Sequence, residues 1–244
     1  GASASFSVAE RDGRLGVVVD EAFLPDLAAR RKFALSRVPG AVDLTLDTLL
    51  SLKPSRLLER VTGATLVIVR SQEIDQVGEG GFAIQARQVM DTVIDNIARA
   101  IKRLAAAGVA HGVVAADHGH LFFAADRDES LRIDAPGGGQ VELHRRCWIG
   151  RGGWTPTACV RVSASDLGYA SDLDFVFPVG CGVFKAGGDL AYHHGGPSLQ
   201  ELVVPVISVR SPAPSGDVGA RPKLAVSGLP DKVTNRIFSV TAEL

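Results

Sequence analysis

The sequence has few cysteines, almost no net charge and no long hydrophobic run, and each of these absences argues against a class of protein. Its three cysteines, Cys147, Cys159 and Cys181, are odd in number and lack Cys-x-x-Cys spacing, which argues against a disulfide framework or a zinc ribbon. The formal net charge of −1 gives no general basic surface for nucleic acid or membranes. No apolar stretch reaches the roughly 18 to 20 residues of a membrane helix. We therefore expect a globular protein of a reducing cytoplasm with no membrane partner.

The chain opens on Gly1-Ala2-Ser3, with neither an initiator methionine nor a basic and apolar leader. This opening predicts that the sequence begins partway through a larger protein. At 244 residues with 46% hydrophobic content, the chain is long enough to bury the core of one large α/β domain.

The most informative stretch is residues 113–120, Val-Val-Ala-Ala-Asp-His-Gly-His, in which an apolar strand ends in one acid and two histidines. Ligands of open α/β sheets collect at the carboxyl ends of strands, and carboxylate with imidazole is a ligand set for zinc and manganese. A second histidine pair, His193 and His194, precedes two glycines that let the backbone approach a bound group closely. Solvated polar residues at a strand end would explain either run alone. The two runs together favour a metal site.

The hydrophobic spacing predicts alternating strands and helices. Strands are expected at residues 15–19, 65–69, 112–116 and 203–209, and helices at 23–35, 44–52, 56–61, 83–107 and 198–202. The strand at 65–69, the helix at 83–107 and the strand at 112–116 form a βαβ unit, which predicts adjacent parallel strands. Short alternating segments at 141–143, 158–162 and 173–177 predict an antiparallel meander.

Both strands of the βαβ unit should end at one edge of the sheet. The first leads into a polar loop, residues 70–79, that contains Asp75 and Glu79, and the second leads into Asp117 and His118. We expect these side chains to lie close enough to share a cation, because clustered carboxylates repel one another without one. The simpler alternative is that Asp75 and Glu79 are loop acids facing water.

Basic residues near glycines are candidates for binding a phosphate. Arg146 and Arg151 lie within residues 144–153, and guanidinium groups hold phosphate by forked hydrogen bonds. Lys185, in a glycine-rich turn, is a further candidate. A solvated hairpin and an exposed turn lysine are the commoner explanations.

The last part of the chain changes in composition. Residues 1–210 would form the α/β domain, and the proline and glycine content of residues 211–222 predicts a linker. Residues 223–244 have strand character, which predicts the start of a further β domain.

Three segments together resemble the PglZ domain, a branch of the alkaline phosphatase superfamily. They are residues 74–79 (Ile-Asp-Gln-Val-Gly-Glu), 116–119 (Ala-Asp-His-Gly) and 194–206 (His-Gly-Gly-Pro-Ser-Leu-Gln-Glu-Leu-Val-Val-Pro-Val), of which the last is the most specific. The resemblance covers residues 15–209. It implies an α/β fold whose alkaline-phosphatase-like, doubly wound sheet has helices on both faces. The meander is then an antiparallel β insertion, and the tail is the start of a C-terminal β segment.

The resemblance also implies two divalent cations, zinc or manganese, and a serine or threonine nucleophile. Carried over by position, Asp75, Glu79 and His194 would hold one ion, while Asp117 and His118 would help to hold the other. Glu79 stands where many relatives have histidine, which shifts the preference toward a harder ion such as manganese. The remaining histidines, His120 and His193, would contact the substrate or support the ligands.

One part of the family pattern is missing. The nucleophile of the superfamily follows a strand-terminal aspartate at a helix start, and the only candidate acid here, Asp20, is not followed by a serine or threonine that opens a helix. The resemblance therefore implies a domain that lacks its N-terminal nucleophile segment.

The implied function is a metal-dependent phosphodiesterase or phosphatase of a bacterial BREX phage-defence system, with nucleic acid or another phosphodiester as substrate and other defence proteins as partners. Phosphoryl transfer needs neutralised charge on the nonbridging oxygens, a positioned nucleophile and a stabilised leaving oxygen, all of which two metal ions supply. Two alternatives stay open. One is a catalytically degenerate phosphatase fold that acts as a scaffold in a defence complex. The other is an unrelated metallohydrolase in which Asp117, His118 and His194 serve a bound water nucleophile.

Overall fold

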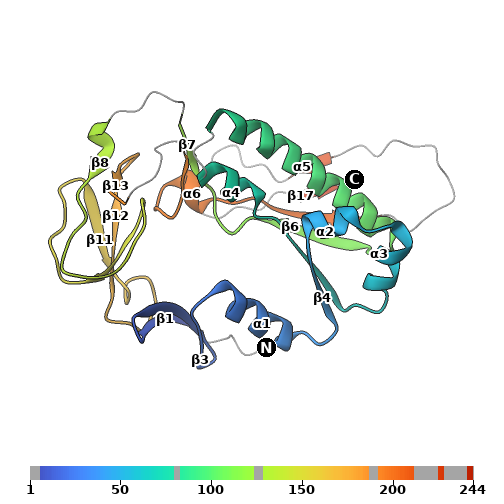
Figure 1. Ribbon diagram of the computed structural model, residues 1–244, viewed down its shortest axis with the longest axis horizontal. Coiled ribbons are helices and arrows are strands. Elements are labelled where there is room, and N and C mark those ends of the chain that lie inside the picture. The colour runs from blue at the N-terminus through green and yellow to red at the C-terminus, as the bar shows by residue number, and fades with distance from the viewer. Residues whose placement is uncertain are drawn as a thin grey trace. The chain divides into compact units, whose positions relative to one another are not determined.

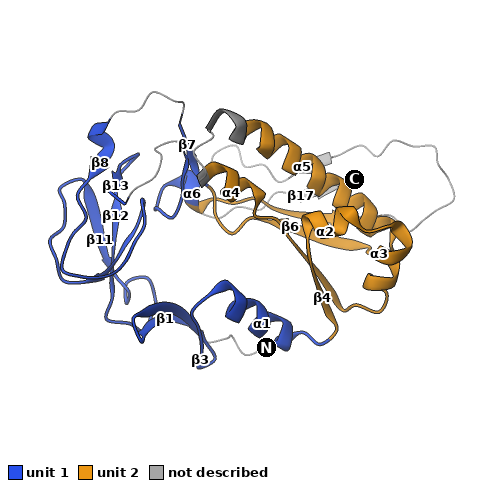
Figure 2. Ribbon diagram, in the orientation of Figure 1, with its two compact units in different colours: residues 1–39, 120–201 blue, residues 40–119, 202–244 orange. Residues whose placement is uncertain are grey.

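A computed structural model of the chain describes residues 6–79, 83–123, 129–186, 192–211, 225–227 and 241–243, whose course is drawn in Figure 1. The chain divides into two compact units, and each unit is built from two separate stretches of sequence (Figure 2). Unit 1 comprises Gly1–Pro39 and His120–Glu201, and unit 2 comprises Gly40–Gly119 and Leu202–Leu244.

Unit 2 holds the α/β part of the chain. Its parallel strands are β4 (Ala41–Thr45) and β5 (Leu66–Arg70), with Ala41 opposite Leu66 and Thr45 opposite Arg70. Its helices are α2 (Leu46–Ser51), α3 (Pro54–Val61), α4 (Glu73–Glu79) and α5 (Ala83–Ala106). Pro54 opens α3, where its missing N–H would have had no partner within the helix.

The core of unit 2 is formed by apolar side chains of β4, α2, α3 and α5. Its buried members are Leu44, Leu46, Leu49, Leu57, Val61, Val93 and Ala100. Val93 and Ala100 are two helical turns apart and therefore lie on the same face of α5. The helical spacing that predicts α5 from the sequence thus corresponds to one buried stripe.

Two further strand pairs belong to unit 2, and both are antiparallel. β6 (His111–Ala115) pairs with β15 (Val206–Arg210), and β16 (Ala225–Ser227) pairs with β17 (Thr241–Glu243). The prediction that β5 and β6 are adjacent parallel strands is wrong for the described residues, because the two strands lie in different two-stranded sheets. The hydrophobic period identifies a strand but carries no information on which strand pairs with it.

Unit 1 consists mainly of antiparallel strands. β1 (Phe6–Arg11), β2 (Arg14–Val19) and β3 (Ala22–Leu24) form a three-stranded sheet that precedes α1 (Leu27–Arg37). The predicted antiparallel strands are present in a four-stranded sheet in the order β11-β12-β10-β9, but this order is not that of a meander, because β10 pairs with β12 and not with β11. Its strands are β9 (Gly139–Leu143), β10 (Trp148–Arg151), β11 (Cys159–Ser163) and β12 (Asp174–Pro178).

Short elements complete unit 1. β7 (Leu121–Phe122) pairs antiparallel with β14 (Tyr192–His193), and β8 (Arg132–Ile133) pairs in parallel with β13 (Val183–Phe184). A 3₁₀ turn, η1 (Glu129–Leu131), precedes β8, and α6 (Leu199–Leu202) spans the boundary at which unit 1 ends. The predicted short helix at 198–202 corresponds to α6.

Three predicted elements differ from the structure. The polar loop expected at residues 70–79 contains the helix α4. The helix expected from residue 44 begins at Leu46, because residues 41–45 form β4. The helix expected from residue 23 begins at Leu27, because Asp20 and Glu21, with φ angles of 46° and 70°, make a tight turn that leads into β3.

The described residues are a mixture of helices and several small sheets, as the sequence predicts for an α/β protein. None of the described helices combines the length and the apolar character needed to cross a bilayer.

Candidate metal centre

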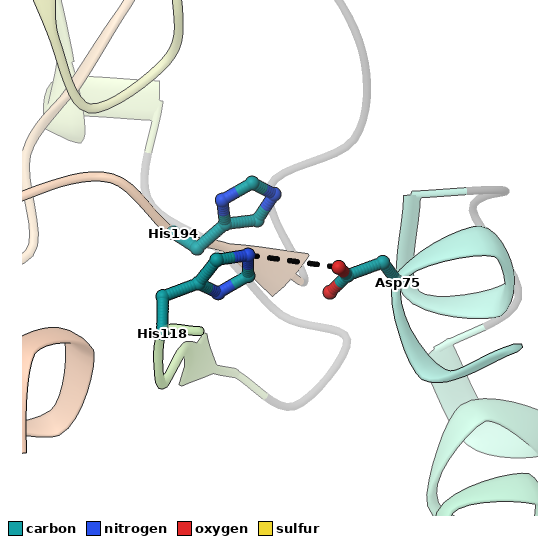
Figure 3. A group of neighbouring side chains, drawn as sticks. All are labelled: Asp75, His118 and His194. Atoms are coloured by element: carbon teal, nitrogen blue, oxygen red, sulfur yellow. Dashed lines mark ion pairs between the residues drawn. The ribbon is translucent and has the colours of Figure 1, made fainter. Parts of the chain in front are cut away.

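Asp75 and His118 follow two strands of unit 2 and meet beyond the strand ends. Asp75 lies in the first turn of α4, shortly after β5, where the positive end of a helix favours a carboxylate. His118 lies in the loop that follows β6. The Nε2 atom of His118 is 3.6 Å from Oδ2 of Asp75 (Figure 3). The structure thus brings together an acid and a histidine that the sequence singles out as metal ligands.

The hydrogen bond of Nδ1 of His118 determines whether Nε2 has a lone pair for binding a metal. Nδ1 lies 3.0 Å from the carbonyl oxygen of Gly119. A carbonyl oxygen only accepts, so Nδ1 carries a proton, and in the neutral ring Nε2 keeps its lone pair. That lone pair and a carboxylate oxygen of Asp75 are compatible neighbours when a cation or a proton lies between them. Metal-binding histidines commonly have their other nitrogen held by a carbonyl in this way, so this pair fits a divalent cation.

Asp117 lies beside His118 but points toward solvent. Its side chain is 86% exposed, and its Oδ1 is 3.9 Å from Nε2 of His118. The same carboxylate accepts a hydrogen bond of 3.1 Å from the backbone N–H of His118. The fourth residue expected at this edge, Glu79, ends α4, and its side chain is outside the described residues.

His194 belongs to unit 1 and directly follows β14. It is partly buried, and its ring lies edge-on to that of Tyr192 with a centroid distance of 5.9 Å. Asp75, His118 and His194 each offer one atom that can bind a metal, and Figure 3 draws their side chains.

The remaining two histidines of the motifs have different surroundings within unit 1. His120 packs against Tyr192, with ring centroids 4.8 Å apart. His193 is only 3% exposed, and its ring lies 6.1 Å from that of Phe123. This burial favours a packing role for His193, while His120 keeps partial exposure.

Two of the basic residues expected to bind phosphate form ion pairs with acids of the protein. Arg151 contacts Asp172 at 2.7 Å and Glu10 at 2.6 Å, and these hydrogen bonds raise the pKa of Arg151 above its ordinary value. Lys185 lies 2.8 Å from Asp134, with both side chains largely exposed. A phosphate at either residue would have to compete with these carboxylates.

The third basic residue, Arg146, is completely buried. Its Nε and Nη2 atoms each donate a hydrogen bond of 2.9 Å to the carboxylate of Glu201, and Nη1 donates to the carbonyl oxygen of Gly182. These contacts favour a structural role for Arg146 over the substrate contact that the sequence suggests. Burial opposes ionisation of Glu201, but hydrogen bonds from Arg146 and Ser198 outweigh it and hold the pKa of this carboxyl below its ordinary value.

Glu201 is a buried acid for which the sequence predicted no role. It lies within the most specific segment of the family resemblance, at residues 194–206, yet no role follows from the sequence for it. The available signal is the combination of an acid in an otherwise apolar stretch and the basic pair at 145–146, because a buried arginine requires a buried acid.

A second carboxylate missed by the sequence analysis lies on β4. The Asp43 side chain is 7% exposed and lies 2.7 Å from Nη2 of Arg70, at the end of the neighbouring strand β5. Because the prediction began a helix at residue 44, it did not place Asp43 in a strand.

A family model described as the BREX system PglZ alkaline phosphatase-like domain matches residues 10–209 of the chain. Among curated proteins and among solved structures, none matches it. The matched range contains Asp75, His118 and His194, and the mixed α/β architecture is consistent with an alkaline-phosphatase-like fold.

Proposed function

Because the chain belongs to the BREX system PglZ family of alkaline phosphatase-like domains, we propose that it is the metal-binding domain of a phosphohydrolase that cleaves a phosphodiester or a phosphomonoester. Family membership gives the phage-defence context and the phosphatase-like character. The observation that carries the metal-dependent part of the proposal is the pair His118 Nε2 and Asp75 Oδ2, 3.6 Å apart. Carboxylate with imidazole suits zinc or manganese.

His194 is the proposed third ligand, and chain connectivity supports it. β7 begins at Leu121, soon after His118, and Leu121 is directly opposite His193 in β14. Three residues of extended chain span at most about 10 Å. This chain connection supports His194 as a ligand of the same ion.

Asp117 and Glu79 complete the proposed ligand set, which would hold two divalent ions. Asp117 adjoins His118, and rotation of its exposed side chain would turn the carboxylate toward a second ion. A bound divalent ion would neutralise charge on the phosphoryl oxygens. His120, which is partly exposed, and Lys185 are the proposed substrate contacts.

A scaffold role is the second candidate function, and it is favoured by the position of Asp20. This acid lies in the tight turn between β2 and β3 and pairs with Arg37 at 2.9 Å. It therefore does not resemble a strand-terminal aspartate that precedes a nucleophile at a helix start. A degenerate phosphatase fold that acts as a scaffold would need neither that aspartate nor the nucleophile.

Calorimetric titration of Zn²⁺ and Mn²⁺ into the chain tests the proposed metal site. The variants are Asp75→Asn and His118→Ala, and the matched control is Asp91→Asn, which changes an exposed acid on α5 of the same unit. We expect metal affinity to fall at least tenfold in both variants and to stay at the parent value in the control. Equal affinity in all four proteins would contradict the site.

Hydrolysis separates the enzyme from the scaffold. The chain is incubated with Mn²⁺ or Zn²⁺ and either bis(p-nitrophenyl) phosphate or p-nitrophenyl phosphate, with His118→Ala as control. Metal-dependent release of nitrophenol that is lost in the variant supports a phosphohydrolase, and the preferred ester identifies the substrate class. Metal binding without release is expected both of the scaffold and of a phosphohydrolase whose nucleophile lies outside this chain, and the same assay on the full-length protein then separates the two.

A further inference from the structure

The loop that carries His194 is held by a buried ion pair that the proposed function does not use. We call residues 194–198, between β14 and α6, the histidine loop. Arg146 and Glu201 are 0% and 2% exposed, and their two parallel hydrogen bonds are both 2.9 Å long. All of these residues belong to unit 1 (Figure 2).

Glu201 binds the histidine loop directly. Its carboxylate accepts hydrogen bonds from the backbone N–H of Gly196 at 2.9 Å, from the backbone N–H of Ser198 at 3.3 Å and from Ser198 Oγ at 2.6 Å. Together with the two bonds from Arg146, five donors converge on one carboxylate. This number of bonds fixes the position of the loop relative to α6, because each bond constrains a different atom.

Gly196 allows the loop to lie against the ion pair. A Cβ atom at this position would come within 2.7 Å of Nε and Nη2 of Arg146 and of Oε2 of Glu201. Only a residue without a side chain can therefore occupy the position while the ion pair keeps its geometry.

The neighbouring arginine holds the other side of His194. Nη1 of Arg145 donates a hydrogen bond of 3.1 Å to the carbonyl oxygen of Tyr192, in β14. Adjacent arginines between β9 and β10 thus bind the chain before His194, at Tyr192, and after it, through Glu201. The backbone on both sides of the histidine is anchored to the same connection between two strands of the four-stranded sheet.

We propose that Arg146 and Glu201 are positioning residues that hold His194 for metal binding. The proposal rests on the proposed function, because it takes His194 as a ligand. A metal ligand must be held in place before the ion binds, or the ordering of the loop lowers the affinity. Arg146 acts through Glu201 and Gly196 and does not contact the metal or a substrate.

The test compares metal affinity and folding in matched variants. Arg146→Lys keeps the charge but loses the two-pronged geometry, and Glu201→Gln keeps the shape but loses the charge and one acceptor oxygen. The control is Arg161→Lys, because Arg161 also binds an acid of unit 1, Asp174 at 2.8 Å, and neither residue belongs to the histidine loop or to the Arg146–Glu201 pair. His194→Ala gives the effect of losing the ligand itself.

Each protein is titrated calorimetrically with Zn²⁺ and Mn²⁺, its fold is checked by circular dichroism, and the visible spectrum of bound Co²⁺ is recorded. The spectrum depends on the number and arrangement of ligands, so a loss of stability alone leaves it unchanged. We expect at least tenfold weaker binding and an altered Co²⁺ spectrum in Arg146→Lys and Glu201→Gln, and parent values in Arg161→Lys.

Two negative results have different meanings. If His194→Ala loses affinity while folded Arg146→Lys and Glu201→Gln bind as the parent does, the positioning role is overturned and the proposed ligand stands. If the parent binds no metal, or His194→Ala binds as tightly as the parent, the proposed ligand fails and the positioning role fails with it.

If Arg146→Lys and Glu201→Gln both prevent folding, a milder variant tests the positioning role. Ser198→Ala removes only the hydroxyl that donates to Glu201 at 2.6 Å. We expect two- to threefold weaker metal binding in this variant. Unchanged affinity would overturn the positioning role.

Discussion

Gly196 is the residue at which the packing of the histidine loop is most sensitive to one added methyl group. Alanine there would bring its Cβ within 2.7 Å of the Arg146 guanidinium and the Glu201 carboxylate, both of which are buried and cannot swing into solvent. We predict that Gly196→Ala lowers the free energy of unfolding by about 1–3 kcal/mol, as expected for overpacking.

Gly112→Ala is the matched control, because a Cβ at Gly112 in β6 meets no atom within 4 Å. We expect this variant to stay within about 0.5 kcal/mol of the parent. Urea denaturation followed by circular dichroism measures both changes. Equal stability of the two variants would show that the ion pair moves aside without cost.

The pKa of Glu201 makes the stability of unit 1 depend on pH. Its carboxyl titrates below the ordinary value of 4.5 in the folded chain, so its ion pair stabilises the fold fully above that value. The contribution is lost as the pH falls through the lowered folded pKa, where the buried carboxylate takes up a proton.

We therefore predict that the stability difference between the parent and Glu201→Gln is constant above about pH 5.5 and shrinks below about pH 4.5. Urea denaturation at a series of pH values between 3 and 7 measures it. A difference that grows as the pH falls would mean that Glu201 is protonated in the fold at neutral pH.

At the scale of the element, α5 has a sharp boundary between its buried and exposed faces. Val93 is 4% exposed and its neighbour Ile94 is 59% exposed. We predict that Val93→Ala costs about 2 kcal/mol of unfolding free energy through the cavity that it leaves, whereas Ile94→Ala changes it by less than about 0.5 kcal/mol. Urea denaturation of both variants checks this, and similar losses would mean that Ile94 packs against something in solution.

Elements with a strong hydrophobic period were predictable, and those defined by local polar contacts were not. The long helix α5 and the strand β5 follow from apolar spacing and from β-branched residues. The helix α4 did not, because Ile74 and Val77 are the only large apolar residues in its seven positions, too few to establish a helical period. The hairpin between β2 and β3 turns on Asp20 and Glu21 at positive φ, a conformation that these residues seldom adopt.

At the scale of the whole molecule, the sequence predicted the meeting of Asp75 and His118 but not the contacts that most of the other polar residues make. Asp75 and His118 were expected to meet because both follow strand ends, and their side chains do lie 3.6 Å apart although β5 and β6 are not paired neighbours. The ion pair of Arg146 and Glu201 joins residues 55 positions apart. No periodicity or motif encodes such a contact, so Arg146 was predicted to bind a substrate.

The proposed ligands come from both units, and this origin leads to a prediction about stability. Asp75 and His118 belong to unit 2 and His194 to unit 1. Both tryptophans of the chain, Trp148 and Trp154, belong to unit 1, so tryptophan fluorescence reports the unfolding of that unit alone.

If His194 binds the metal, an added ion stabilises unit 1 as well as unit 2, because a ligand stabilises whatever structure it requires. With Zn²⁺ at a hundred times its dissociation constant, mass action gives about 2.7 kcal/mol of stabilisation. We therefore predict that Zn²⁺ raises the melting temperature detected by tryptophan fluorescence in the parent, and that His194→Ala abolishes the rise. Calorimetry on the same samples shows whether metal is bound. Binding that leaves the fluorescence melting temperature unchanged would confine the ligands to unit 2, with Asp117 in place of His194 as the next one to test.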